Sequence, residues 1–191
     1  MITLDGIMQA PGGPEEDTSG GFKYGGWTVP FQDEIFEQIF KKELSEPFDL
    51  MLGRKTYEIF ASYWPEQTGF IAEPFNNAKK YVVSHNSIPL TWNESILIND
   101  KVVEKIKELK TQDGPTFHIW GSGNLLQTLF QNDLVDELRL RLYPVTIGSG
   151  KKLFAEGTIP AAFELIDTQA LPSGVILANY KRGGELKTGT H

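Results

Sequence analysis

The segment between residues 117 and 130 constrains the fold of this chain more than any other. Residues 117–120 form a short apolar run that predicts a buried strand, and Gly121, Ser122 and Gly123 follow at once. Apolar residues then recur at helical spacing from residue 125 to residue 130. A strand that turns through glycine into a helix leaves bare N–H groups at the positive end of the helix dipole. The segment therefore predicts an α/β fold with a corner able to hold a phosphate.

A second corner of this kind follows the strand predicted at residues 48–52. Gly53, Arg54, Lys55 and Thr56 open a helix with two cations and a hydroxyl group. Cations there oppose the helix dipole at a cost of a few tenths of a kcal/mol, roughly, unless an anion joins them. Two such corners in one chain indicate a dinucleotide. The alternatives are a solvated first turn at Arg54 and an ordinary helix start at Gly123.

Two further strand ends carry polar side chains. Ser84 and His85 follow the strand predicted at residues 80–84 and add a hydroxyl and an imidazole group. Asp5 ends the first strand, where its carboxylate is a candidate acid or substrate contact, or alternatively forms a turn with Gly6. Ligands of open α/β sheets lie at the carboxyl ends of strands, which favours a ligand-binding role for the residues at all these strand ends.

Composition excludes several classes of function. The 191 residues suit one domain, and a net charge of −7 argues against nucleic acid as a partner. No apolar run approaches roughly 18 residues, so we expect no membrane span, and no secretory signal is evident at the N-terminus. Cysteine is absent and the three histidines are scattered, which argues against disulfides and a metal site and fits a cytoplasmic protein.

Alternating elements predict the architecture. We expect a mostly parallel central sheet with helices on both faces and an antiparallel C-terminal hairpin. Strands are predicted at residues 1–4, 48–52, 80–84, 95–98, 117–120, 135–143, 162–171 and 175–181. Helices are predicted at residues 31–44, 54–62, 99–110 and 124–131, with Asn99 or Asp100 as a cap. A glycine-rich loop covers residues 12–26. One domain is expected over residues 1–183, followed by a flexible tail at 184–191.

Taken in order, these segments resemble the dihydrofolate-reductase-like superfamily. The resemblance is strongest to the C-terminal reductase domain of the bifunctional riboflavin-biosynthesis deaminase/reductase. The matching segments are residues 3–6, 10–13, 52–58, 82–84, 121–123 and 143–154. They are spread over nearly the whole chain. The zinc motif of the deaminase half is absent, since it needs cysteine.

This resemblance implies a three-layer fold and NADPH as the hydride donor. In the family pattern the Gly53 corner, with Arg54, Lys55 and Thr56, would hold the adenosine phosphates, and Ser84 and His85 would lie near the 2′-phosphate. The other corner would hold the pyrophosphate and the first loop would flank the nicotinamide. Its residues are Gly121, Ser122, Gly123 and Asn124 for the pyrophosphate and Ala10 for the nicotinamide.

One departure from the family pattern concerns the substrate. Dihydrofolate reductases carry an acid two residues after the proline of Trp-x-x-Pro, and here Trp27 and Pro30 are followed by Gln32 in that position. Asp33 is one residue further, rotated by about 100° if the helix has begun. An amide cannot donate a proton as a carboxylic acid does, which argues against dihydrofolate. Trp27 and Gln32 are predicted substrate contacts, Asp5 the first candidate proton donor and Asp33 the second.

The sequence therefore predicts an NADPH-dependent reductase of a small pyrimidine- or pterin-like heterocycle. By resemblance, the activity is of the 5-amino-6-(5-phosphoribosylamino)uracil reductase type. The alternatives are a catalytically silent nucleotide-binding dimeric module and a purely structural role with ordinary glycine turns. Relatives imply a homodimer, with the late strands near the contact.

Overall fold

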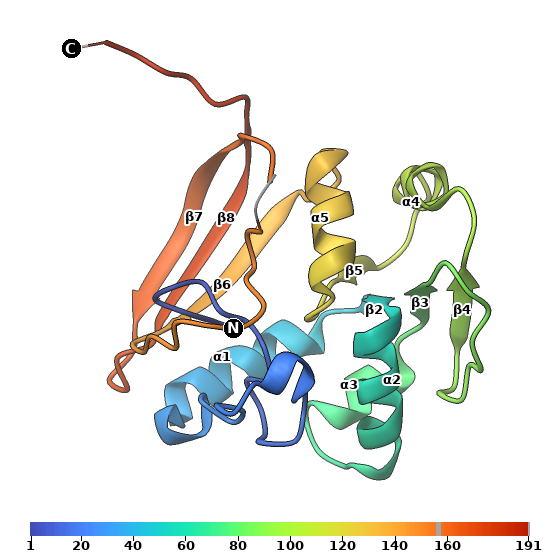
Figure 1. Ribbon diagram of the computed structural model, residues 1–191, viewed down its shortest axis with the longest axis horizontal. Coiled ribbons are helices and arrows are strands. Elements are labelled where there is room, and N and C mark those ends of the chain that lie inside the picture. The colour runs from blue at the N-terminus through green and yellow to red at the C-terminus, as the bar shows by residue number, and fades with distance from the viewer. Residues whose placement is uncertain (156–157, 191) are drawn as a thin grey trace. The chain divides into compact units, whose positions relative to one another are not determined.

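The computed structural model describes residues 1–155 and 158–190 (Figure 1). Contacts between residues divide the chain into two compact units. Unit 1 comprises Met1–Ile35 and Leu129–His191, and unit 2 is the continuous segment Phe36–Thr128. The expectation of a single domain over residues 1–183 stays a prediction.

Unit 2 contains a four-stranded parallel sheet in the order β4-β3-β2-β5. Its strands are β2 (Phe48–Gly53), β3 (Lys80–Val83), β4 (Ser95–Ile98) and β5 (Thr116–His118). Leu50 and Leu52 of β2 are fully buried, as expected of a strand covered on both faces. Because every pair is parallel, the carboxyl ends of all four strands lie at one edge of this sheet.

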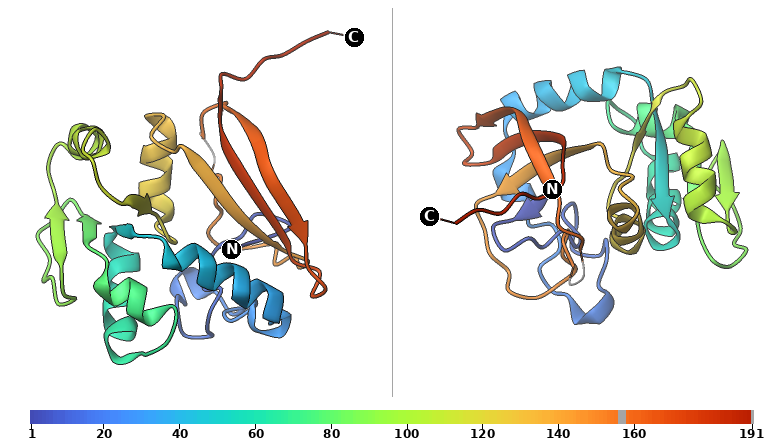
Figure 2. Two further views of the ribbon diagram at one scale, coloured as in Figure 1. Left: turned by 180° about the vertical axis from the view of Figure 1, so that it is seen from behind. Right: turned by 90° about the horizontal axis from the view of Figure 1, so that it is seen from above.

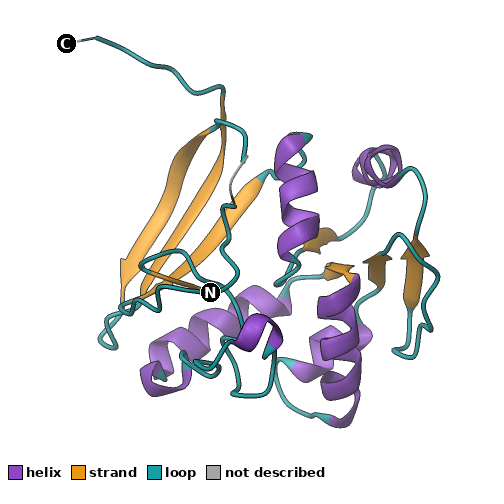
Figure 3. Ribbon diagram, in the orientation of Figure 1, coloured by secondary structure: helices purple, strands orange, loops and turns teal. Residues whose placement is uncertain are grey.

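Unit 2 has a core rich in aromatic side chains, and Figure 3 shows its helices in purple. They are α2 (Arg54–Tyr63), η3 (Trp64–Glu66), α3 (Ala72–Asn77) and α4 (Val102–Lys110). Two more helices, α1 (Glu34–Ser45) and α5 (Gly123–Gln131), cross the boundary between the units along the chain. Phe40, Phe48, Tyr57, Phe75 and Trp92 are each less than a tenth exposed and belong to one cluster. This core anchors the sheet whose edge carries the two predicted corners.

Unit 1 contains a mixed four-stranded sheet in the order β1-β6-β8-β7 (Figure 2). Its strands are β1 (Ile2–Thr3), β6 (Glu137–Tyr143), β7 (Ala162–Ala170) and β8 (Ile176–Gly184), and it also holds two short 3-10 helices, η1 (Ser19–Gly21) and η2 (Val29–Phe31). Only β1 and β6 pair in parallel. The turn between β7 and β8 contains Gly174 at φ +86°, as the predicted hairpin requires. The α/β class, the parallel sheet and the C-terminal hairpin are confirmed, with the described strands arranged as two sheets.

Two predicted helix starts are wrong. The first helix begins at Glu34, because Pro30 lies in η2 and Asp33 stands outside the helix. The helix predicted from Asn99 or Asp100 begins at Val102, and neither residue caps it. Lys101 takes the capping position at φ +43°, and Asp100 forms an ion pair with Lys105 at 3.1 Å.

Two other features were not predicted. The short helix α3 contains Pro74, a residue that favours a loop interpretation although it is tolerated in a first turn. Arg141 alternates with leucines in β6, a pattern that favours a solvated side chain, yet it is only 6% exposed. Its guanidinium donates to the side-chain oxygen of Asn179 at 3.0 Å, which satisfies part of a polar group that would otherwise be costly to bury.

Candidate functional site

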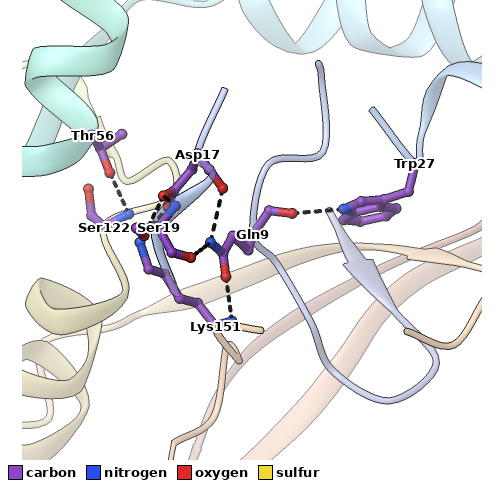
Figure 4. Close-up of polar contacts among 7 residues, drawn as sticks. All are labelled: Gln9, Asp17, Ser19, Trp27, Thr56, Ser122 and Lys151. Atoms are coloured by element: carbon purple, nitrogen blue, oxygen red, sulfur yellow. Dashed lines mark hydrogen bonds and ion pairs between the residues drawn. The ribbon is translucent and has the colours of Figure 1, made fainter. Parts of the chain in front are cut away.

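The two glycine corners lie side by side at the carboxyl edge of the sheet in unit 2. Their strands, β2 and β5, are direct parallel neighbours. The N–H of Gly53 donates to Ser122 Oγ at 2.9 Å. The N–H of Ser122 donates to Thr56 Oγ1 at 2.9 Å (Figure 4). The start of α2 is therefore linked to the segment that opens α5 by two direct hydrogen bonds.

The backbone at the second corner requires a glycine. Gly121 and Ser122 have φ values of +57° and +55°, in the left-handed region. A Cβ atom on Gly121 would lie 3.1 Å from Thr56 Oγ1 and 3.2 Å from Thr56 Cγ2, so a larger residue would push Thr56 aside. Ser122 tolerates the same region while its hydroxyl donates to the carbonyl of Trp120 at 2.9 Å.

Several backbone N–H groups at the two corners remain available to a ligand. The first bond of the α5 ladder runs from Leu126 N to the carbonyl of Ser122, so the N–H groups of Gly123 and Asn124 precede it. Within the described residues these two groups, and those of Arg54 and Lys55 in α2, have no acceptor. A Cβ atom on Gly123 would meet nothing within 4 Å. Open space therefore adjoins a rim of backbone donors.

Charged side chains flank the Gly53 corner. Arg54 Nη1 forms an ion pair with Glu58 at 3.0 Å, one turn further along α2, and both side chains are about half exposed. Lys55 is exposed and has no ion pair within the described part of the chain. The pair with Glu58 offsets part of the positive charge of Arg54, so Lys55 is the cation that an anion here would meet without competition.

Ser84 and His85 lie at the end of β3, on the same edge of the sheet. Ser84 is 5% exposed, and its hydroxyl donates to the carbonyl of Asn86 at 2.8 Å. That bond closes a tight turn after the strand. His85 is exposed, so of this pair the imidazole is the group that solvent and ligands can reach.

In unit 1, Gln9 organises the glycine-rich loop (Figure 4). This side chain is 4% exposed, and its Nε2 donates to the carbonyls of Asp17 and Ser19 at 3.0 and 2.9 Å. Its Oε1 accepts from Lys151 N at 3.1 Å, and its carbonyl accepts from Trp27 Nε1 at 2.8 Å. Lys151 Nζ is also ion-paired with Asp17. Sequence reasoning missed Gln9 because a single glutamine belongs to no recognisable motif.

Ala10, the predicted nicotinamide contact, lies at φ +47° and is 3% exposed. Its carbonyl accepts from Gly26 N at 2.9 Å, which draws the two ends of the loop together. A Cβ atom on Gly25 would lie only 2.4 Å from the carbonyl oxygen of Gly13. Backbone contacts thus close the loop, and the segment at Gly13 can approach the segment at Gly25 because Gly25 has no side chain.

The same loop holds a carboxyl group that sequence reasoning did not single out. Glu16 Oε2 accepts from Gly12 N at 2.6 Å. Burial raises the pKa of Glu16, although the hydrogen bonds from Gly12 and Gly13 act in the opposite direction. Glu16 therefore keeps its proton to a higher pH than an ordinary glutamate.

Trp27 and Gln32 were predicted to contact substrate. Trp27 is 8% exposed and packs edge-to-face on Tyr143, with ring centroids 5.3 Å apart. Together with its bond to Gln9, this makes Trp27 an anchor of the loop in the core of unit 1. Gln32 is exposed and follows η2 in an extended conformation.

Asp5, the first candidate proton donor, is held as an acceptor. Its carboxylate accepts from Thr3 Oγ1 at 2.5 Å, from Gly148 N at 2.6 Å and from Ile147 N at 3.2 Å. The bond from Thr3, then that from Gly148, lowers the pKa of Asp5 below its ordinary value. At neutral pH the group is therefore ionised and fixes the turn at residues 147–148, so it has no proton to donate.

Asp33, the second candidate, caps α1. Its Oδ1 accepts from Ile35 N at 2.8 Å, the N2 position of the helix, and its Oδ2 accepts from Ser173 N at 3.1 Å. The second bond ties the start of α1 to the β7–β8 turn. Both oxygens of Asp33 therefore serve the fold, and the expected 100° displacement around the helix does not apply.

The described residues contain neither a cluster of metal ligands nor a membrane-spanning helix. Within residues 1–155 and 158–190, no three or more His, Asp or Glu side chains are grouped so as to hold a metal ion. In the same part of the chain, no helix has the length and apolar character needed to cross a membrane.

Comparisons with known proteins agree with this geometry. The model of the RibD C-terminal domain family matches residues 1–177. The uncharacterized protein YyaP of Bacillus subtilis (strain 168) is 27% identical over 188 residues, which are 96% of this chain and 92% of YyaP.

Two solved structures share the fold. A putative riboflavin biosynthesis protein from Shewanella sp. PV-4 superposes with a TM-score of 0.64 at 20% identity, over 95% of this chain and 94% of that one. Dihydrofolate reductase from Enterococcus faecalis, complexed with NADP(H) and RAB-propyl, has a TM-score of 0.56 at 17% identity, over 95% and 92% of the two chains. The fold is thus dihydrofolate-reductase-like, and the chain belongs to the RibD C-terminal domain family.

Proposed function

We propose that this protein is an NADPH-dependent reductase that transfers hydride to a small pyrimidine- or pterin-like heterocycle. Membership of the RibD C-terminal domain family supports a reductase-type activity. One structural observation carries the cofactor assignment. The N-terminal ends of two helices are joined through Ser122 and leave a shared rim of backbone donors.

The residues present fit the phosphates of a dinucleotide. Free N–H groups at Gly123 and Asn124 suit the anionic oxygens of a pyrophosphate, because they lie at the positive end of α5. Lys55 adds a cation at the start of α2. The space beside Gly123, which no Cβ fills, leaves room for a phosphate group against the backbone. A related fold with NADP(H) bound, that of the Enterococcus enzyme, also supports this assignment.

The roles of the protein groups follow from this arrangement. NADPH, when bound, supplies the hydride. The two corners hold its phosphates, and the loop fixed by Gln9 and Ala10 is proposed to orient the nicotinamide ring. Exposed His85 is proposed to favour a cofactor with a 2′-phosphate. Because Asp5 and Asp33 act as hydrogen-bond acceptors in the fold, we assign neither of them the transfer of a proton.

Gly123→Ala tests the cofactor site. The Cβ of a helical residue tilts toward the helix N-terminus, where the phosphate is proposed to lie. We expect NADPH affinity to fall by about 10-fold or more, equivalent to about 1.4 kcal/mol, with no loss of thermal stability. Affinity is measured from the change in NADPH fluorescence.

Gly114→Ala is the matched control. Gly114 lies in the loop before β5, and its Cβ would also meet nothing within 4 Å. This variant should bind NADPH as the parent does. A parent protein that fails to bind NADPH up to about millimolar concentration, a weak-binding limit, would contradict the proposed function.

The alternative is a nucleotide-binding module without turnover. The carboxylates of Asp5 and Asp33 both accept hydrogen bonds within the fold. This favours the binding module, because neither carboxylate is left to protonate a substrate. NADPH oxidation in the presence of pterins, pyrimidines and quinones separates the two functions. Tight binding without oxidation by any of these compounds indicates the silent module.

A further inference from the structure

We propose that Ser122 is a positioning residue that sets the distance between the two phosphate corners, and that Thr56 is the hydroxyl that donates to the cofactor. The inference rests on the proposed function. The family pattern assigns both Ser122 and Thr56 to cofactor binding. We infer that the hydroxyl of Thr56 binds the cofactor and that the hydroxyl of Ser122 does not.

The hydroxyl of Ser122 has no proton to offer a phosphate. A serine hydroxyl carries one proton, and that of Ser122 is donated to the carbonyl of Trp120 at 2.9 Å. Its oxygen also accepts from Gly53 N at 2.9 Å. Phosphate oxygens act as acceptors, so a hydroxyl that has only lone pairs left cannot bind them. Ser122 is also 8% exposed, as befits a structural group.

In Thr56 the hydroxyl oxygen is occupied and the hydroxyl proton is available, unlike in Ser122. Its Oγ1 accepts from Ser122 N at 2.9 Å, and within the described residues its own proton has no acceptor. Thr56 lies in the first turn of α2 and is half-buried. The bond from Ser122 fixes the oxygen in place, which leaves the proton free to point to a ligand at the two helix starts.

The hydrogen bonds of Ser122 form a continuous series from one corner to the other. The Trp120 carbonyl, the Ser122 hydroxyl and the Gly53 N–H connect the end of β5 to the end of β2, and the bond from Ser122 N to Thr56 adds the first turn of α2. A ligand that spans both corners needs them at a fixed separation. A ligand that occupies one corner does not, so loss of the Ser122 hydroxyl should affect the two kinds of ligand differently.

Ser122→Gly tests the positioning role, with NADPH and adenosine 2′,5′-bisphosphate as probes. Glycine adopts the left-handed backbone of position 122 without strain, so the variant keeps the turn and loses only the hydroxyl. We expect NADPH affinity to fall by about 10-fold, within the range of couplings between sites. Affinity for adenosine 2′,5′-bisphosphate, whose phosphates are proposed to occupy the Gly53 corner and the His85 end of the site but not the Gly121 corner, should stay within about twofold of the parent.

Thr56→Val and Thr56→Ser test the donor role. Valine keeps the shape of threonine and removes the hydroxyl, whereas serine keeps the hydroxyl. We expect Thr56→Val to weaken both probes by about 10-fold, the order of one charge-assisted hydrogen bond. Thr56→Ser should restore most of that affinity. Thermal melting of each variant shows whether it is folded.

The measured affinities decide whether Ser122 has the positioning role and Thr56 the donor role. Unchanged NADPH affinity in Ser122→Gly, or an equal loss for both probes, overturns the positioning role. Parent-like affinity in Thr56→Val overturns the donor role. A parent that binds NADPH but not adenosine 2′,5′-bisphosphate shows that the Gly53 corner does not bind without the Gly121 corner, which contradicts the inference and leaves the proposed function standing. A parent that does not bind NADPH contradicts both.

Discussion

At the scale of single residues, Lys80 lies in surroundings that are rare for a lysine. It is fully buried in β3, where Nζ donates to the carbonyl of Asn76 at 2.7 Å and lies 4.4 Å from the centre of the Trp92 ring. Burial lowers the pKa of Lys80 to about 8, against a smaller opposing effect of Glu94. The charge is therefore only partly compensated in the folded protein.

This burial predicts an unusual pH dependence of stability. Between about pH 8 and pH 10 the unfolded chain keeps the proton of Lys80 while the folded protein loses it, so stability rises with pH. The rise is at most about 1.4 kcal/mol per pH unit. Urea unfolding of the parent from about pH 8 to pH 9.5 should show it. Lys80→Met, which cannot titrate, should give a flatter profile, and a parent whose stability falls over this range would exclude the effect.

Residues that obey backbone rules could be predicted from the sequence, and those that depend on distant partners could not. Gly121 follows from the strand–turn–helix pattern, and its left-handed φ agrees. Gln9 and Arg141 acquire their roles from residues far along the chain, such as Lys151 and Asn179. The same limit applies to Ser122, because the fate of its one hydroxyl proton depends on the three-dimensional placement of Trp120.

At the scale of elements, Asp33 joins the start of α1 to the hairpin of β7 and β8. Replacing an N-cap acid by alanine costs about 1 kcal/mol, typically. Asp33→Ala also loses the acceptor for Ser173 N, so we expect a loss of about 1–2 kcal/mol in the free energy of unfolding. Denaturant titration gives this value.

Gln32→Ala is the neighbouring control, since Gln32 is exposed and no hydrogen bond of its side chain is found among the described residues. Its stability should match the parent. If substrate turnover is found, Asp33→Ala should keep it at temperatures where the variant is folded. A loss of turnover without loss of stability would instead return Asp33 to a catalytic role.

Elements with strong periodicity were predicted well, and their ends less so. The strand at Ser95–Ile98 is confirmed at both ends, and the helix predicted at residues 54–62 differs by one residue. The start of α1 was placed too early because proline suits both a 3-10 turn and the first turn of an α-helix. The start of α4 was missed because Lys101 adopts a left-handed conformation that lysine rarely takes.

At the scale of the whole molecule, β7 leaves an open edge. It pairs only with β8, residues 164–170 are exposed, and Leu165 and Ile166 are 53% and 49% exposed. An edge strand with exposed apolar side chains is a template for pairing with another chain. We therefore propose β7 as the contact of the expected homodimer.

Ile166→Lys should convert such a dimer to a monomer, because an added charge would have to be buried in the contact. Sedimentation velocity measures the change. Ile96→Lys is the matched control, since Ile96 is 44% exposed on β4, the edge strand of the other sheet. That variant should keep the mass of the parent. A monomeric parent would exclude the dimer.

Unit 2 is one continuous stretch of chain, whereas unit 1 is assembled from both sides of it. On the ribosome, unit 2 can therefore complete its core while its companion is still unfinished. The first strand, β1, finds its partner only when β6 has emerged, since the two pair directly. Synthesis at about 5–20 residues per second leaves the N-terminal segment waiting for several seconds. Nascent chains halted before β6 should therefore protect unit 2 from protease and leave the first 35 residues open to cleavage.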